Sequence, residues 1–170
     1  MTNFKGHSEI AKAFFIIDER FSSMNEFVPK TPSELQLIST FSQYMVVYIS
    51  RTIEGAVKNM ILTKAILKQL DKMKLAEIDE TLKKFLNPKC ENIISCIKET
   101  LGINIEKKCF EDEQLNALGI IINDRHKIAH SDETIEAIQN IKSLSELEKH
   151  YKNIKKFIEK LCGILSLDIN

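Results

Sequence analysis

The segment that begins at Ser33 limits most strongly what this chain can fold into. Its run from Tyr44 to Ile49, with the sequence YMVVYI, leaves almost no polar side. A helix that is apolar around its whole circumference has to be covered by other elements, because apolar surface left in water costs free energy. The sequence therefore predicts a long central helix with other helices packed around it.

Apolar periodicity predicts the helices that cover this centre. A first helix is expected from Ser8 to Phe27, and it ends before Pro29 and Pro32, which push their preceding residues out of helical geometry. The spacing of Ser143 and Glu146 is a capping box that starts the last helix. The next predicted ranges are a short helix from about Leu75 to Leu86, a helix from Pro88 to Thr100 that stops at Gly102, and a connection from Ile103 to Phe110. A further helix is expected to begin between Glu111 and Glu113, and the last helix is expected to end at about Leu165.

The composition agrees with a helical domain of ordinary size. The 170 residues are 44% hydrophobic and 28% charged, with five glycines and three prolines. So few turn-forming residues favour helices over a sheet, and a chain of this length buries enough apolar surface to fold alone. We expect one all-α domain over residues 1–170, an up-and-down helical bundle of four to five main helices.

Charge and cysteine pattern narrow the classes of function. The formal net charge is zero, so there is no overall positive field and a polyanion has to be held by a local patch. Cys90, Cys96, Cys109 and Cys162 show no C-x-x-C spacing, nothing resembles a signal peptide, and no apolar run reaches about eighteen residues. These features predict reduced thiols, no membrane span and a cytoplasmic location.

The stretch from Asn123 to Asp132 carries the strongest functional signal. It holds Asp124, Arg125, His126 and His130, which is half of the chain's four histidines and one of its three arginines. The plainest interpretation is a helix C-terminus, where cations complement the helix dipole. A second is a metal site, because His126 and His130 are four residues apart, although no third ligand or nearby glutamate is evident from spacing.

A third interpretation is a pair of catalytic residues acting on a phosphodiester. Cleavage of an RNA strand needs a group that takes the 2′-hydroxyl proton, a group that protonates the leaving oxygen, and positive charge on the transition state. Histidine suits the proton transfers and arginine suits the phosphate oxygens. Five residues on a straight helix turn by about 140° net, so Arg125 and His130 meet only if the helix ends or bends between them, as the polar residues after His130 suggest.

The sequence from Arg125 to His130, RHKIAH, resembles the R-x4-6-H motif of HEPN domains. The polar residue after the arginine and the Ala-His ending are typical of that family. The upstream segment from Tyr48 to Val57 is similar to the Glu-containing helix that precedes the motif in HEPN relatives of the RiboL-PSP type. Position 126 is His where the family most often has Asn, so His126 and His130 both remain candidates for proton transfer.

The resemblance implies a homodimeric helical bundle with two Arg–His pairs in one cleft. It also implies a metal-independent endoribonuclease that needs no cofactor and leaves 2′,3′-cyclic phosphate ends. Such proteins are usually toxins of toxin–antitoxin or phage-defence systems, held in check by a partner protein. We assign catalytic roles to Arg125, His130 and His126, and supporting roles to Glu54, which could orient Arg125, and Asp124. The alternative is a non-catalytic HEPN-like subunit for dimerisation or partner binding.

Two charged stripes have a surface and a functional interpretation. Arg51, Glu54 and Lys58 share one side of the central helix, and lysines of the last helix lie opposite its apolar side. Solvated helix faces explain both stripes, and we favour that explanation. The alternatives are a wall of a polar site and a groove that binds phosphates. The lysines of the last helix are Lys149, Lys152, Lys156 and Lys160.

Overall fold

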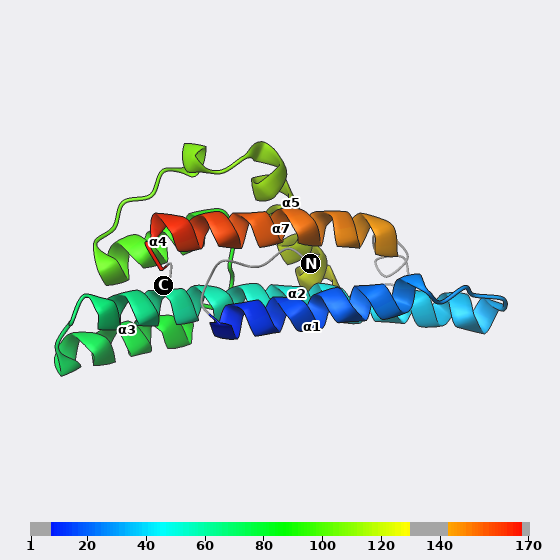
Figure 1. The fold of residues 1–170 in the computed structure, drawn as a ribbon, viewed down its shortest axis with the longest axis horizontal. Helices are drawn as coiled ribbons and strands as arrows, with labels where there is room; N and C mark the ends of the chain where they lie inside the picture. The colour runs from blue at the N-terminus through cyan, green and yellow to red at the C-terminus, as the bar shows by residue number, and fades with distance from the viewer. Residues whose placement is uncertain (1–7, 130–142, 168–170) are drawn as a thin grey trace.

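The protein is all-α in its computed structural model, which describes residues 8–129 and 143–167. Four longer helices and a short helical hairpin follow one another (Figure 1). The predicted fold class is confirmed. In chain order the elements are α1 (Ser8–Asn25), α2 (Pro32–Leu67), α3 (Lys72–Lys84), α4 (Cys90–Leu101), the 3-10 turn η1 (Lys107–Cys109), α5 (Asp112–Ala129) and α7 (Leu144–Ile164).

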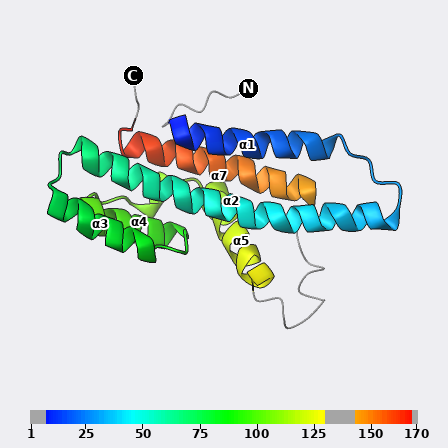
Figure 2. The same ribbon diagram turned by 90° about the horizontal axis from the view of Figure 1, so that it is seen from below.

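Helix α2 is the centre of the structure. It contacts α1, α3, α4, α5 and α7. Figure 2 shows α1 and α7 running beside α2, the α3–α4 hairpin at one end, and α5 crossing the others so that its C-terminal end points away from them. Met45, Val46 and Ile49, from the apolar run, are fully buried. The prediction of a central helix with others packed around it is therefore confirmed, although the apolar run is not covered on every side, since Tyr44 is 47% exposed.

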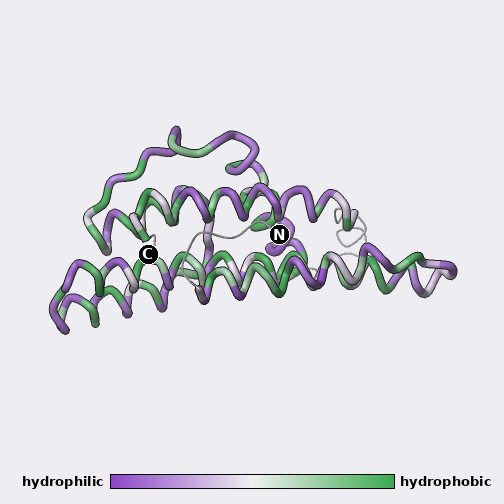
Figure 3. The backbone as a smooth tube through the Cα atoms, viewed as in Figure 1, coloured by the Kyte–Doolittle hydropathy of each residue, from purple (hydrophilic) through white to green (hydrophobic). Residues whose placement is uncertain are grey.

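Hydrophobic residues recur turn by turn along the helices (Figure 3), and the buried ones form one core. In α7 the buried side chains lie at three-to-four spacing, and they pack with those of α1, α2 and α5 in one core. Burial of this kind stabilises by about 25 cal/mol per Å² of apolar surface. The buried side chains of α7 are Leu147, Tyr151, Ile154, Phe157, Ile158, Leu161 and Cys162.

Local capping residues set several of the helix boundaries. Ser143 and Glu146 form the predicted capping box, and Gly102 stops α4 with a left-handed φ of 68°. A second capping box, from Thr31 to Glu34, starts α2 with Pro32 in its first turn. Its pattern was present in the sequence but did not enter the prediction.

Two predicted helix starts in the hairpin are wrong. The third helix begins at Lys72 rather than Leu75, because the side chain of Asp71 accepts a hydrogen bond from the backbone N–H of Lys74 and caps an earlier turn. The fourth begins at Cys90 rather than Pro88. Lys89, its N-cap, has an extended backbone, and its N–H donates to the carbonyl of Asn87, so the chain is still turning there.

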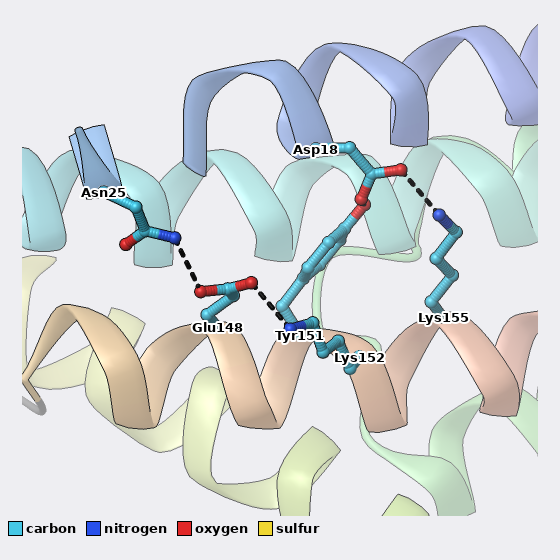
Figure 4. Close-up of polar contacts among 6 residues, drawn as sticks. All are labelled: Asp18, Asn25, Glu148, Tyr151, Lys152 and Lys155. Carbon is cyan, nitrogen blue, oxygen red and sulfur yellow. Dashed lines mark hydrogen bonds and ion pairs between the residues drawn. The ribbon is translucent and has the colours of Figure 1, made fainter. Parts of the chain in front are cut away.

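Polar contacts fasten α7 to α1 beside the core (Figure 4). The buried hydroxyl of Tyr151 donates to the carbonyl oxygen of Phe14 at 2.9 Å and to Oδ1 of Asp18 at 2.8 Å. Lys155 donates to the other oxygen of Asp18 at 2.6 Å. Nearby, Asn25 and Lys152 both contact the carboxylate of Glu148. The two helices are therefore held in one register by directional bonds as well as by packing.

Replacement of Tyr151 by Phe tests these contacts. We expect Tyr151→Phe to lower the free energy of unfolding by about 1 to 2 kcal/mol, because the ring stays packed while its hydrogen bonds are lost. Urea unfolding measures the change. Tyr48→Phe is the matched control, since none of the described residues forms a hydrogen bond with the Tyr48 hydroxyl. Equal stability of the two variants would contradict the assigned contacts.

The same tyrosine predicts an alkaline loss of stability. Burial and the bond to Asp18 raise the pKa of Tyr151 above its usual value of 10.0. A raised folded-state pKa means that the stabilisation is complete below pH 10 and decreases as the pH rises above it. Above pH 10, we therefore expect the free energy of unfolding of the wild type to fall by about 1.4 kcal/mol per pH unit relative to that of Tyr151→Phe. Urea unfolding of both proteins at each pH gives the difference, and a constant difference would contradict the prediction.

Candidate functional site

The last turns of α5 carry the described part of the predicted motif. Apolar residues on one side of this helix, among them Leu118, Ile121 and Ile122, are fully buried against α2 and α7. This packing fixes the helix that presents Asp124, Arg125 and His126. His130 lies outside the described residues, as do Ser131 and Asp132. The expected break between Arg125 and His130 therefore stays a prediction.

Arg125 is half-buried and tied to a distant part of the chain. Its Nη1 donates to the carbonyl oxygen of Leu86 at 2.9 Å. Leu86 lies in the connection between α3 and α4, so the bond links the end of α5 to the hairpin. A guanidinium has five N–H donors in a rigid fork. One anchored donor therefore holds the side chain in place while other donors stay available for an anion.

Asp124 points into the bundle. It is only 4% exposed, and its Oδ1 accepts from Nζ of Lys127 at 3.1 Å. Its Oδ2 is buried and has no hydrogen-bond partner among the described residues. A buried carboxylate with one oxygen unpaired costs free energy. Within the described part of the chain, the carboxylate of Asp124 is therefore paired at one oxygen only, by Lys127.

His126 is exposed on the same turn of α5. It follows Arg125 directly and is therefore rotated from it by about 100° around the helix axis. Of its proposed metal partner, His130, the structure describes nothing. Among residues 8–129 and 143–167, no group of three or more His, Cys, Asp or Glu side chains is arranged to hold a metal ion.

Glu54 has a different partner from the one expected. Its Oε1 lies 2.7 Å from Nζ of Lys58, and both side chains are partly buried on α2. Arg125 instead donates to Leu86. The pair of Glu54 with Lys58 thus supports the surface ion-pair interpretation of this stripe. Glu54 and Arg125 form no hydrogen bond or ion pair with each other, so the structure gives no support to the prediction that Glu54 orients Arg125.

The lysines of α7 occupy the predicted face. Lys149, Lys152, Lys156 and Lys160 are exposed, and Lys152 pairs with Glu148 at 2.7 Å. The opposite side of the helix is buried. The helical arrangement inferred from the spacing is therefore correct.

The cysteines are free thiols, as predicted. Burial raises the pKa of Cys90 and of Cys96 to about 11, and a neighbouring glutamate adds to each shift. A thiol with so high a pKa is protonated near neutral pH and is a poor nucleophile. These two residues therefore serve as small apolar side chains in the core.

The contact that the sequence did not reveal is the one between Arg125 and Leu86. It joins a side chain to a main-chain carbonyl 39 positions away. Every residue type has that carbonyl, so no residue pattern could have marked the partner. A second unforeseen group, formed by arginine and tyrosine side chains on α1 and α2, lies apart from the motif.

Comparison with known proteins identifies one family. The sequence model of the RiboL-PSP-HEPN family matches residues 15–167, a range that includes the whole motif and the segment from Tyr48 to Val57. No curated protein and no solved structure gives a significant match. None of the helices among the described residues is long and apolar enough to cross a membrane.

Three variants test whether Asp124 is held by Lys127. We expect Lys127→Met to lower the free energy of unfolding by about 1 to 3 kcal/mol, because it leaves a buried carboxylate without its cation. The double variant Asp124→Leu/Lys127→Met should regain that loss, since no charge remains to be buried. Urea unfolding of both, with Asp124→Leu alone as the control, measures the coupling. Additive effects of the two substitutions would show that the pair contributes nothing.

Proposed function

The chain belongs to the RiboL-PSP-HEPN family, and from this membership we propose that it is a metal-independent endoribonuclease acting through Arg125 and His130. The observation that carries the proposal is that the family match spans the motif from Arg125 to His130. The anchored, half-buried position of Arg125 supports it, because a cation that stabilises a transition state has to be held in place before the reaction.

The proposed reaction is an internal transesterification of RNA. The 2′-oxygen attacks phosphorus, the bond from phosphorus to the 5′-oxygen breaks, and a 2′,3′-cyclic phosphate and a free 5′-hydroxyl result. One group takes the proton from the 2′-hydroxyl and another protonates the 5′-oxygen. We assign proton transfer to His130, stabilisation of the negative charge on phosphorus to Arg125, and a positioning role to His126.

A second copy of the chain would complete the site. The two proton transfers take place on opposite sides of the phosphorus atom, so two motifs facing each other provide both groups. The end of α5 points away from the other helices, where a second copy can reach it (Figure 2). A cleft formed by two copies concentrates the cations of both motifs, which suits a chain whose net charge is zero. We therefore propose a homodimer.

We further propose that the enzyme is the toxin or effector of a toxin–antitoxin or phage-defence system. An RNase that needs no cofactor is active as soon as it folds, and a cell tolerates it only when a partner protein holds it inactive. The alternative is a subunit that keeps the bundle for dimerisation or partner binding and cleaves no RNA. Expression of the wild type and of His130→Ala in a host separates the two functions, because growth arrest by a nuclease should disappear when the proposed proton-transfer group is removed.

Substitutions in the motif test the catalytic roles. We expect Arg125→Lys to reduce the rate of RNA cleavage about 100-fold, because lysine lacks the planar fork. We expect His130→Ala to reduce it about 100-fold or more through loss of proton transfer. Single-turnover cleavage of a labelled RNA in the presence of a chelator measures both, and the termini of the products are identified by mass spectrometry.

The matched control is His126→Asn, which introduces the residue most common in the family. This variant should keep most of its activity if His130 transfers the protons. Loss of activity in His126→Asn together with retention in His130→Ala would move that role to His126. Undiminished cleavage by Arg125→Lys and His130→Ala would refute the mechanism, and abolition of cleavage by the chelator would favour a metal site instead.

A further inference from the structure

A group of aromatic and arginine side chains lies between α1 and α2. It consists of Arg20, Phe41, Tyr44, Tyr48 and Arg51, and we name it the aromatic–arginine face. The chain has three arginines and three tyrosines, and two of each belong to this group. The other basic residues of the protein are almost all lysines. The grouping of arginines and tyrosines on one surface therefore points to a ligand that these two residue types bind better than other residues do.

The aromatic rings of this face form a stack along α2. Positions 41, 44, 48 and 51 follow at steps of three and four, so their side chains line one side of the helix. The rings of Tyr44 and Tyr48 are stacked, with centroids 5.7 Å apart and planes at 17°, and Phe41 follows at 6.4 Å. Tyr44 is 47% exposed. The stack therefore presents one aromatic ring to the solvent.

Arg20 reaches this stack from α1. Its Cζ lies 4.3 Å from the centre of the Tyr48 ring and 5.2 Å from that of Tyr44, and its Nη1 donates to the hydroxyl of Tyr44. The guanidinium is thus fixed on the aromatic rings by cation–π contact and a hydrogen bond. Arg51, one helical turn beyond Tyr48, is exposed.

Neither arginine is used in an ion pair within the described part of the chain. The acidic side chains that form ion pairs in this region are matched with lysines instead: Glu9 with Lys12, Asp18 with Lys155 and Glu54 with Lys58. The aromatic–arginine face therefore combines an exposed ring with two arginines that form no ion pair with a described carboxylate.

We propose that the aromatic–arginine face binds single-stranded RNA. A base stacks on the exposed ring of Tyr44, and Arg20 and Arg51 contact the flanking phosphates. Aromatic rings that alternate with cations are the common means of holding a single strand without reading its sequence, and arginine binds phosphate through its fork. The proposal rests on the proposed function, since it supplies a binding surface for the substrate of that reaction.

The location of the face makes this a surface for holding the strand and not a second catalytic centre. Figure 2 shows α1 and the end of α5 on different sides of α2. An RNA has to be several nucleotides long to touch both the face and Arg125. The face therefore contributes to the cleavage of a long strand, while a dinucleotide bound at the motif does not reach it.

Binding of an RNA that cannot be cleaved tests the proposal without requiring nuclease activity. The probe is a fluorescent 2′-O-methyl RNA of roughly 12 nucleotides, which keeps bases and phosphates but lacks the attacking hydroxyl. We expect Tyr44→Leu to weaken binding about 10-fold, because leucine keeps apolar volume but offers no ring. Tyr44→Phe, which keeps the ring, should bind nearly as well as the wild type. Fluorescence anisotropy gives the affinities.

Salt dependence tests the arginine contact. Arg51→Gln should lower the slope of log affinity against log salt concentration by about 0.7, the value for one lost phosphate contact on a single strand. Arg51→Lys should keep that slope because it keeps the charge. With unmodified RNA, Tyr44→Leu should slow cleavage of the long strand at low enzyme concentration and leave cleavage of a dinucleotide unchanged, which separates lost binding from damage to the fold.

Equal affinity of the wild type, Tyr44→Leu and Arg51→Gln for the probe would overturn the proposal, whether or not the protein cleaves RNA. Loss of probe binding in these variants would support it even if the wild type cleaves nothing, in which case only the proposed catalysis fails. A protein interface is the competing use of this surface, because Ile16, one turn before Arg20, is 43% exposed. If Ile16→Ser and Tyr44→Leu both halve the molecular mass in solution and leave probe affinity unchanged, the face binds a second copy instead.

Discussion

The burial of the apolar side of α2 under its neighbours is the constraint on which the rest of the structure depends. The apolar side of such a helix is stable in water only when other helices cover it, and in the described part of the chain α1, α3, α4, α5 and α7 do so. Each covering helix then has one face in the core and one in solvent, which places lysines on the outside of α7 and charged pairs along α1 and α2. The amphipathic pattern of the covering helices thus follows from the burial of the apolar side of α2.

The candidate catalytic residues use this scaffold in a particular way. Helix α5 is held in the core by its middle turns, and its last turns present Arg125 and His126 at the surface. The hydrogen bond from Arg125 to Leu86 ties this end to the hairpin. Asp124 is buried on the same turn, and its Oδ2 has no hydrogen-bond partner among the described residues. Unfavourable buried polar groups are common at functional sites, where function and not stability retains them.

The charge distribution bears on the proposed binding of RNA by a protein of zero net charge. The acidic side chains that form ion pairs along α1 and α2 are matched with lysines, so the arginines at the motif and on the aromatic–arginine face have no described carboxylate partner. Net charge describes the whole surface, whereas phosphates respond to the potential at the surface they touch. The distinction between arginine and lysine therefore carries more information about function here than the total charge does.

Local sequence signals determined most of the helices, some of their boundaries and the family of this protein. Three-to-four apolar spacing predicted the helices, Ser143 with Glu146 and Gly102 marked boundaries, and the run from Arg125 to His130 pointed to the family, because these signals involve residues close together in the chain. Only the tertiary structure decided what meets across the chain. The carbonyl that anchors Arg125, the lysine that pairs with Glu54, and the arginine that lies on Tyr44 and Tyr48 come from helix packing and side-chain rotamers. A main-chain acceptor or a ring face has no sequence signature, and so the structure had to supply these contacts.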